Sequence, residues 1–523
     1  MFETNFTMLD WAIIAGYLLF IAGVGLYVNR HVHESADYLV GGRSAGTALS
    51  VASFIGTGLG LVTVVYASLD AFHNGFSYLA IALLDLAAAF LLGITGFGIA
   101  KLRELNLVTI TEYFEVRYNR GVRVTAGILC ALAGILNMGL FPKMGATFIT
   151  YASGLGGENP EVLINIMSTG LILLVLVYTV SGGMVAIIIT DYLQFVLLSL
   201  GLGLGLYFCM TNSMIGWDRI VDTLASEKGE MAFNPFHENS YGWTYLLWQA
   251  CLVSAAALCW APEASRALTT EDVVTTKRTF YLGSSGFFAR LALPALWGVA
   301  AFCFVTHSSE FGDFFSKANL DNPENSDRAL ASVPLMMGKL FPTGLLGVVM
   351  AGLMAAHMSV HDSYLLAWAT VISQDIIGPL RKHKPLTDAQ NIWVTRVAVV
   401  LIATFLITWG IWYPLPKSVW TYMAITGTIY VSGAVAALVG GMYWKAASST
   451  GALLALLGGL FAVLALDPVR NGILGALGQD PAHTFWYSDR TVGLGTFVVS
   501  ILLFVVGSVL FPDRKKTEEG IHA

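Results

Sequence analysis

Long apolar stretches constrain the fold of this chain more than any other feature. A helix needs about 20 mostly apolar residues to cross a bilayer. We identify such candidate spans at residues 11–29, 45–69, 77–100, 122–153, 161–180, 184–211, 242–262, 278–306, 343–376, 391–412, 417–443, 449–466 and 491–511. Charged residues make up only 12% of the chain, whereas soluble proteins carry about 25%. We therefore expect an all-α polytopic membrane protein with about 13 transmembrane helices.

The distribution of basic residues predicts how these helices are oriented. Alternate loops between the candidate spans are rich in Lys and Arg, and the loops between them, such as 157–161 and 310–327, are poor in both. Basic loops face the cytoplasm. We therefore expect the N-terminus outside and the C-terminus inside, in the inner (plasma) membrane. The lipid bilayer is the expected partner; nucleic acid is not, and a monomer satisfies the pattern.

One candidate span, residues 343–376, contains polar residues in its middle. These are His357, Ser359, His361, Asp362 and Ser363. Ala356, Ser359 and Ser363 are spaced by three and four residues, so they share one face of a helix. An unpaired polar group in hydrocarbon costs several kcal/mol, so this face requires another helix, water or an ion. We interpret it as half of a cation site.

The second candidate span, residues 45–69, is rich in glycine near its middle. Gly56, Gly58 and Gly60 alternate with other residues there, and each glycine weakens a helix by about 1 kcal/mol relative to alanine. An unwound segment would free backbone carbonyls to bind a cation. Close packing against another helix through small residues is the alternative interpretation.

Three motifs extend this picture. They are YTVSGGMVAIIITDYLQ at 178–194, AAHMSVHDS at 355–363 and GGMYWKAASSTGALLALLGG at 440–459. Together with the loop SADYLVGGRS at 35–44 and the thirteen expected spans, they resemble the sodium/solute symporter family. The resemblance implies a LeuT-type fold with two inverted five-helix repeats in a single transporter domain, residues 1–523. Its expected parts are a leading helix and loop (1–44), repeats at 45–211 and 242–443, C-terminal helices (449–511) and a cytoplasmic tail (512–523).

The resemblance also implies a sodium site between the two repeats. Its ligands would be the backbone carbonyls of Ala52, Ile55 and Ala356 and the hydroxyl of Ser359. Oxygen ligands suit a hard cation such as sodium. Val360 departs from the family pattern, which has a second Ser or Thr at that position, so one side-chain ligand is missing.

A second cation site is implied at Asp191, Asp362 and Ser363. Charged residues within membrane spans are rare and commonly functional. Asp191 has an alternative role as a structural ion pair or a helix cap, and Asp362 has one as a partner of His361 or Lys143.

The expected solute site comprises Gly56 and Thr57 in the glycine-rich segment, Lys143 and Asp85. Lys143 lies in the middle of a span, on a helix that the resemblance places against the solute cavity, which favours a carboxylate as the solute. A permanent pair between Lys143 and an aspartate is the alternative. Trp260 and Glu263, near the cytoplasmic end of their span, are candidates for a gate, unless Glu263 simply bonds Arg266, three residues later.

These observations predict a secondary active transporter rather than an enzyme. It would couple inward sodium flux to uptake of a small polar or anionic organic solute by alternating access, with sodium as the coupling ion and no organic cofactor. Proton coupling in the same fold is an alternative, because Val360 weakens sodium ligation and because Asp191, Asp362, His357 and His361 could carry protons. A membrane-embedded sensor or enzyme is less favoured, since the sequence contains no metal signature and no nucleophile motif.

Overall fold

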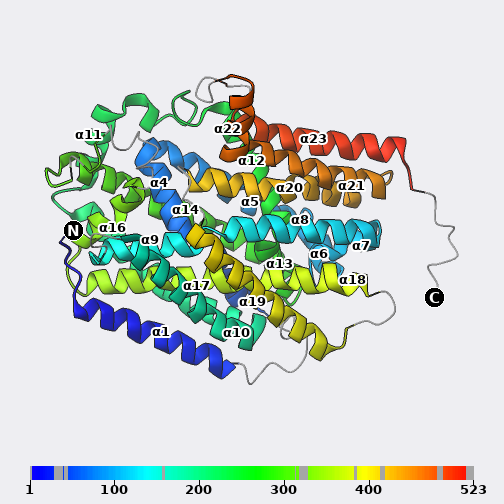
Figure 1. Cartoon of the computed structure of the whole chain (residues 1–523), viewed down its shortest axis with the longest axis horizontal. Helices are drawn as coiled ribbons and strands as arrows, with labels where there is room; N and C mark the ends of the chain where they lie inside the picture. The colour runs from blue at the N-terminus through cyan, green and yellow to red at the C-terminus, as the bar shows by residue number, and fades with distance from the viewer. Residues whose placement is uncertain are drawn as a thin grey trace.

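The computed structural model describes residues 3–28, 39, 45–155, 160–311, 314–316, 328–381, 386–412, 418–479, 484 and 487–513. These residues form helices, together with one isolated β-bridge between Ala45 and Thr270. Most of the expected loop at 35–44 and the tail beyond Asp513 lie outside the described residues. Figure 1 shows long helices that run roughly side by side, with the start of α1 (Met8–Val28) and the end of α23 (Asp489–Leu510) at opposite ends of the bundle.

The first part of the chain contributes the helices that were expected to form the first repeat. They are α3 (Thr47–Gly58), α4 (Leu61–Asn74), η3 (Gly75–Tyr78), α5 (Leu79–Thr95), α6 (Ile99–Glu104), α7 (Glu112–Arg117), α8 (Arg120–Met138), α9 (Phe141–Ser153) and α10 (Pro160–Thr211). Two of the expected spans, 161–180 and 184–211, are merged in α10. A non-helical residue, Gly183 with φ 56° and ψ −152°, separates them. Glycine adopts this positive φ readily.

The second part begins with two short helices in the segment before the expected second repeat, α11 (Trp217–Glu227) and η4 (Gly229–Ala232), and continues with the helices of that repeat, 242–443. The helices of the repeat are α12 (Gly242–Cys259), α13 (Ala261–Thr269), α14 (Val273–His307), η6 (Arg328–Ala331), α16 (Ser332–Leu340), α17 (Leu345–Val371), η7 (Ile372–Ile377), α18 (Gly378–Leu380), α19 (Asp388–Trp412) and α20 (Val419–Tyr443). The elements α21 (Ser449–Gly458), η8 (Gly459–Ala465) and α22 (Asp467–Ala476) follow before α23.

The expected all-helical membrane fold is confirmed, while its count of spans is not. Ten of the described helices are long and apolar enough to cross a membrane, or eleven if the bent pair Ser449–Ala465 and Asp467–Ala476 is one span. Two expected spans begin with shorter apolar helices, Met8–Val24 and Thr47–Gly58. The total of thirteen, the orientation of the termini and the repeat boundaries stay predictions.

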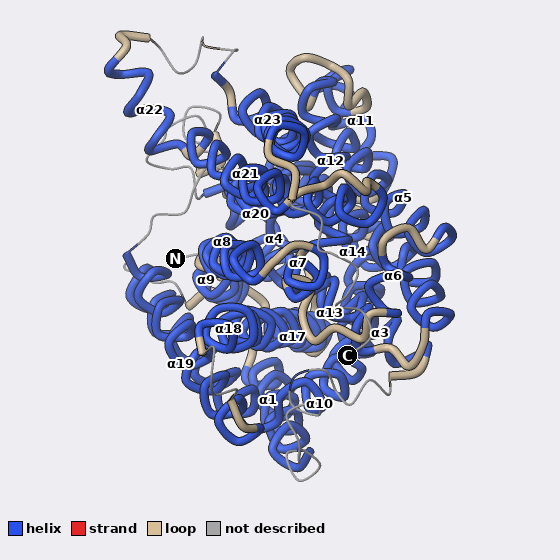
Figure 2. The backbone as a smooth tube through the Cα atoms, turned by 90° about the vertical axis from the view of Figure 1, so that its right-hand side faces the viewer, coloured by secondary structure: helices blue, strands red, loops and turns tan. Residues whose placement is uncertain are grey.

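Helix α17 lies in the interior of the bundle and organises the helices that form the site. Nearly all of its residues are buried, and it packs against α10, α1, α19 and α8. Figure 2 looks nearly along the helix axes and shows α17 surrounded by other helices. Because no lipid or water reaches most of this helix, its polar side chains must find partners within the protein.

Candidate functional site

The glycine-rich helix is broken where α3 meets α4. Leu59 (φ −103°, ψ 80°) and Gly60 (φ −96°, ψ 166°) interrupt the helix at the end of the predicted glycine-rich segment, and Gly56 remains helical. The freed carbonyl of Gly58 accepts hydrogen bonds from Thr63 Oγ1 at 3.0 Å and from Arg290 Nη1 at 3.1 Å. The break therefore presents a backbone oxygen to polar groups deep in the bundle.

A second break, which was not predicted, separates α12 from α13. Trp260 leaves the helical conformation (φ −71°, ψ 116°), and α13 starts at the next residue with a proline in its first turn. Proline is tolerated in a first turn because the N–H it lacks would have no partner there. Pro262 was therefore the available signal that the helix breaks at Trp260, near the end of the expected span 242–262, of which Gly242–Cys259 is long and apolar enough to cross a membrane.

The first break and the polar face of α17 meet, as the sodium-site prediction requires. A Cβ atom added at Gly56 would lie 3.4 Å from Ser359 Oγ, so α3 approaches α17 closely at this level. The other predicted sodium ligands, Ala52, Ile55 and Ala356, are buried. The Ile55 carbonyl accepts a hydrogen bond from the Leu59 amide at 2.9 Å, which leaves it a second lone pair. The role of these four residues as ligands stays a prediction.

The Ser359 hydroxyl donates a hydrogen bond to the carboxylate of Asp191 on α10. Ser53 on α3 donates to the other Asp191 oxygen at 2.8 Å. Asp191 is fully buried, and it therefore connects α3, α10 and α17 through hydrogen bonds at one point in the bundle.

Arg266 on α13 neutralises Asp191 and contacts three other helices, α3, α10 and α17. Its Nη2 lies 3.1 Å from Asp191 Oδ2 and 2.6 Å from Ser363 Oγ, and its Nε donates to Thr57 Oγ1 at 2.8 Å. Nη1 contacts the Met184 sulfur at 2.9 Å. The structural ion pair that was one alternative for Asp191 is thus present. Asp191 and Ser363, from the predicted second cation site, meet around a guanidinium, and the third member, Asp362, is also buried on α17.

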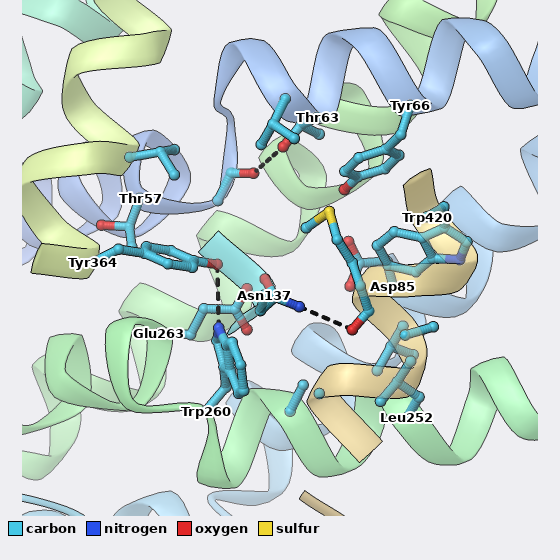
Figure 3. Close-up of a pocket in the computed structure, with 18 of the residues that line it drawn as sticks. Thr57, Thr63, Tyr66, Asp85, Asn137, Leu252, Trp260, Glu263, Tyr364 and Trp420 are labelled. Atoms are coloured by element: carbon cyan, nitrogen blue, oxygen red, sulfur yellow. Dashed lines mark hydrogen bonds between the residues drawn. The ribbon is translucent and has the colours of Figure 1, made fainter. Parts of the chain in front are cut away.

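A cavity opens beside both breaks (Figure 3). Its lining includes Thr57, Gly58, Val62, Thr63, Tyr66, Asp85, Asn137, Phe141, Trp260, Glu263, Arg290, Val360, Tyr364 and Trp420. Trp260 Nε1 donates to the Tyr364 hydroxyl at 3.1 Å, as the dashed line in Figure 3 marks. Of the predicted solute and gate residues, Thr57, Asp85, Trp260 and Glu263 line this cavity, whereas Gly56 and Lys143 are not among its lining residues.

Three charged side chains meet at the wall of this cavity. Arg290 on α14 pairs with Asp85 on α5 at 2.7 Å and with Glu263 on α13 at 3.4 Å. The partner of Glu263 is therefore Arg290, not Arg266, and Glu263 lies beside the second break. Its role as a gate stays a prediction. The signal for Arg290 was a single arginine within an apolar segment, which must pair inside the bundle or reach the membrane surface.

The two histidines of α17 lie next to each other. Their ring centroids are 4.0 Å apart, and His361 Nδ1 lies 2.7 Å from the His357 carbonyl oxygen. Both side chains are buried. Among the described residues, no group of three His, Cys, Asp or Glu side chains could hold a metal ion. This geometry agrees with a hydrogen-bonded pair within the bundle.

Comparisons with known proteins point to one group of transporters. The family model described as "Sodium:solute symporter family" matches residues 38–459. The chain is 26% identical to the sodium/sialic acid symporter SiaT of Proteus mirabilis, over 88% of this chain and 90% of the relative. It is 26% identical to a sodium/glucose cotransporter of Vibrio parahaemolyticus, over 86% and 84%. It is 23% identical to the sodium/pantothenate symporter of Escherichia coli, over 95% of each chain.

Solved structures support the same fold. The model is similar to a Na+-coupled sialic acid symporter in a substrate-bound, outward-open state, with a TM-score of 0.76 at 20% identity over 97% of this chain and 99% of that one. It is also similar to MhsT in complex with L-phenylalanine, with a TM-score of 0.52 at 14% identity over 89% and 99%. At these identities the likeness concerns the fold alone.

Proposed function

Because the chain belongs to the sodium:solute symporter family, we propose that it carries a small polar organic solute inward together with sodium by alternating access. The observation that carries this proposal is the meeting of two broken helices, α3/α4 and α12/α13, at one cavity beside the polar face of α17. Broken helices at the interface of two repeats are the usual setting of substrate and ion sites in such transporters. An inner-membrane location is part of the same proposal.

We place the coupling sodium between α3 and α17. The carbonyls of Ala52, Ile55 and Ala356 and the Ser359 hydroxyl are the proposed ligands. To bind the ion through an oxygen lone pair, Ser359 can keep its hydrogen bond to Asp191, because a hydroxyl is both donor and acceptor. Val360 packs against Gly60 at this level and supplies no oxygen, so water or backbone would complete the shell.

A second sodium at Asp191, Asp362 and Ser363 receives less support. Arg266 already places a positive charge within hydrogen-bonding distance of Asp191 and Ser363, and like charges repel strongly in a buried site. We therefore propose that one sodium ion binds and is carried in each transport cycle.

Coupling follows from contacts shared by the two sites. Thr57 lines the solute cavity and also accepts a hydrogen bond from Arg266, which pairs with Asp191 beside Ser359. A ligand shifts an equilibrium between outward-open and inward-open states only if it binds one of them better. Sodium and solute therefore assist each other when both stabilise the same arrangement of α3, α13 and α17. A membrane potential of 100 mV contributes about 2.3 kcal/mol per charge moved.

The preference for an anionic solute depended on Lys143 facing the cavity. Lys143 is a half-buried residue of α9 and does not line the cavity. We therefore propose a polar solute without assigning its charge from Lys143. Some relatives are named as carriers of carboxylates, but the residues that line this cavity must decide the charge of the solute carried by this chain.

Transport by purified protein in liposomes tests the proposal. We expect solute-dependent currents or uptake when sodium is high outside, and none when potassium replaces sodium at equal membrane potential. Equal uptake without sodium that rises as the external pH falls would support proton coupling instead. In that case His357 and His361 would be the first residues to replace.

A further inference from the structure

The solute cavity has an excess of negative charge. The described residues that line it include three charged side chains, namely Asp85, Glu263 and Arg290. Two carboxylates and one guanidinium leave a formal charge of one negative, and all three residues are more than 90% buried. A buried charge is costly unless it is paired. A bound positive charge would therefore lower the cost of burying these groups.

Arg290 has little capacity left for a solute. Its Nε and Nη2 both donate to Asp85 Oδ2, at 2.9 and 2.7 Å. Its Nη1 donates to the Gly58 carbonyl at 3.1 Å, and its guanidinium stacks 4.0 Å from the Phe287 ring centroid. Asp85 therefore compensates the charge of Arg290, and the protein uses most of its donors. A solute carboxylate would have to break these contacts and would bring a further negative charge.

The excess charge resides on Glu263. Its contact with Arg290 measures 3.4 Å, at the weak end of the range for hydrogen bonds. Its second oxygen accepts no hydrogen bond from any described residue. Figure 3 shows the Glu263 carboxylate between Trp260 and Asn137 at the edge of the open space. One oxygen of this carboxylate is thus available to a ligand.

Aromatic side chains enclose the same space. Tyr66 and Trp420 pack with ring centroids 4.7 Å apart on one side, and Trp260 and Tyr364 are hydrogen-bonded to each other on the other. Figure 3 shows both pairs around the cavity that contains Glu263 and Asp85. The faces of tyrosine and tryptophan rings attract organic cations, and desolvation strengthens this attraction.

From the unshared carboxylate and the aromatic walls together, we infer that the transported solute carries a positively charged ammonium group, which lies between Glu263 and these rings. This inference rests on the proposed symport function, because it names the solute class of that same cavity. Such a group compensates the excess charge, whereas a neutral polyol leaves it and an anion increases it.

Currents from proteoliposomes on a solid-supported membrane test the inference. The probes are three cationic compounds, grouped here as amines (the quaternary ammonium ion choline and the protonated amines ethanolamine and putrescine), three neutral compounds (3,3-dimethylbutan-1-ol, glycerol and glucose) and three anions (pyruvate, pantothenate and N-acetylneuraminate). We expect the highest apparent affinity in sodium for an amine. A sodium-dependent current with the highest affinity for a neutral or anionic probe overturns the inference and leaves sodium symport standing.

Binding measured separately distinguishes the two failures. If no probe gives a sodium-dependent current, the symport proposal fails. Thermal stabilisation of the detergent-solubilised protein by the same probes then decides the charge preference. Stabilisation by amines alone supports the ammonium site, and stabilisation by none of them, or equally by all classes, contradicts it.

Variants locate the charge. Glu263→Gln should raise the half-saturating amine concentration at least tenfold, whereas Glu263→Asp, which keeps the charge, should recover most of the affinity. Asp375→Asn is the matched control, because Asp375 also pairs with an arginine, Arg123 at 2.8 Å, yet does not line the cavity. Unchanged amine affinity in folded Glu263→Gln protein refutes the inference. If that variant does not fold, Trp420→Leu replaces it, and an unchanged amine affinity there has the same meaning.

Discussion

Replacing Gly60 by alanine would test the contact between the α3/α4 break and α17 most sharply. The added Cβ would lie 2.6 Å from Val360 Cγ2 and 3.1 Å from Val360 Cβ. An ordinary contact starts near 3.4 Å, so the two helices must separate by 3.4 − 2.6, about 0.8 Å. Overpacking of this kind costs about 1–3 kcal/mol. Because the φ of Gly60 is negative, alanine brings no backbone strain and regains about 0.4–1 kcal/mol by restricting the unfolded chain. The midpoints of these two ranges give a net loss of about 1.3 kcal/mol.

A double-mutant cycle isolates the contact. Val360→Ala removes both methyl groups that the new Cβ would meet, so the double variant should recover most of the loss. The coupling free energy should then be about 1–2 kcal/mol in favour of the pair, within the range measured for residues in contact. Reversible unfolding in mixed micelles with increasing dodecyl sulfate provides the free energies of unfolding.

Gly203→Ala on α10 is the control, since an added Cβ there has no atom within 4 Å. It should be neutral or stabilising. Two results would refute the reasoning, because each would show that the break does not pack on α17. One is a Gly60→Ala variant as stable as the Gly203→Ala variant, and the other is additive changes in the free energy of unfolding for Gly60→Ala and Val360→Ala.

Three further predictions concern function. Val360→Ser restores the hydroxyl that the family pattern has at this position, and should lower the sodium concentration for half-maximal uptake; an unchanged or higher value would place sodium elsewhere. Arg266→Lys keeps the charge but loses the planar guanidinium that joins Thr57, Asp191 and Ser363. The free energy of unfolding, measured from a denaturation curve, should fall by about 2–3 kcal/mol, and wild-type stability would contradict the described contacts. Lys143→Ala should leave solute affinity unchanged in a binding titration, and a tenfold loss would return this residue to the solute site.

Much of the fold could be predicted because it follows from local chemistry. Apolar length alone locates membrane helices, and each expected span contains a helix in the structure. The break near Gly60 was also predictable, since three closely spaced glycines weaken a helix locally. Its exact place depends on Val360, which approaches Gly60 from α17, and no local pattern contains that information.

The partners of buried charges could not be predicted in the same way. Arg290 meets Asp85, which is 205 residues away in the chain, and Arg266 meets Thr57, which is 209 residues away. The sequence shows that such charges need partners but not which ones. Glu263 is an example. Arg266, three residues later, was the nearer candidate partner in the sequence, but the chain breaks at Trp260 and Glu263 pairs with Arg290 instead.

Equilibrium binding of radioactive sodium to the purified protein tests the central claim most directly. The comparison is between wild type, Ser359→Ala and Ser332→Ala. In this control a similarly buried hydroxyl donates to the backbone carbonyl of Ala329 in the preceding helix η6. We predict saturable sodium binding by wild type and Ser332→Ala, with affinity at least tenfold weaker in Ser359→Ala. Identical binding by all three proteins, or no saturable binding by wild type, would contradict a sodium site between α3 and α17.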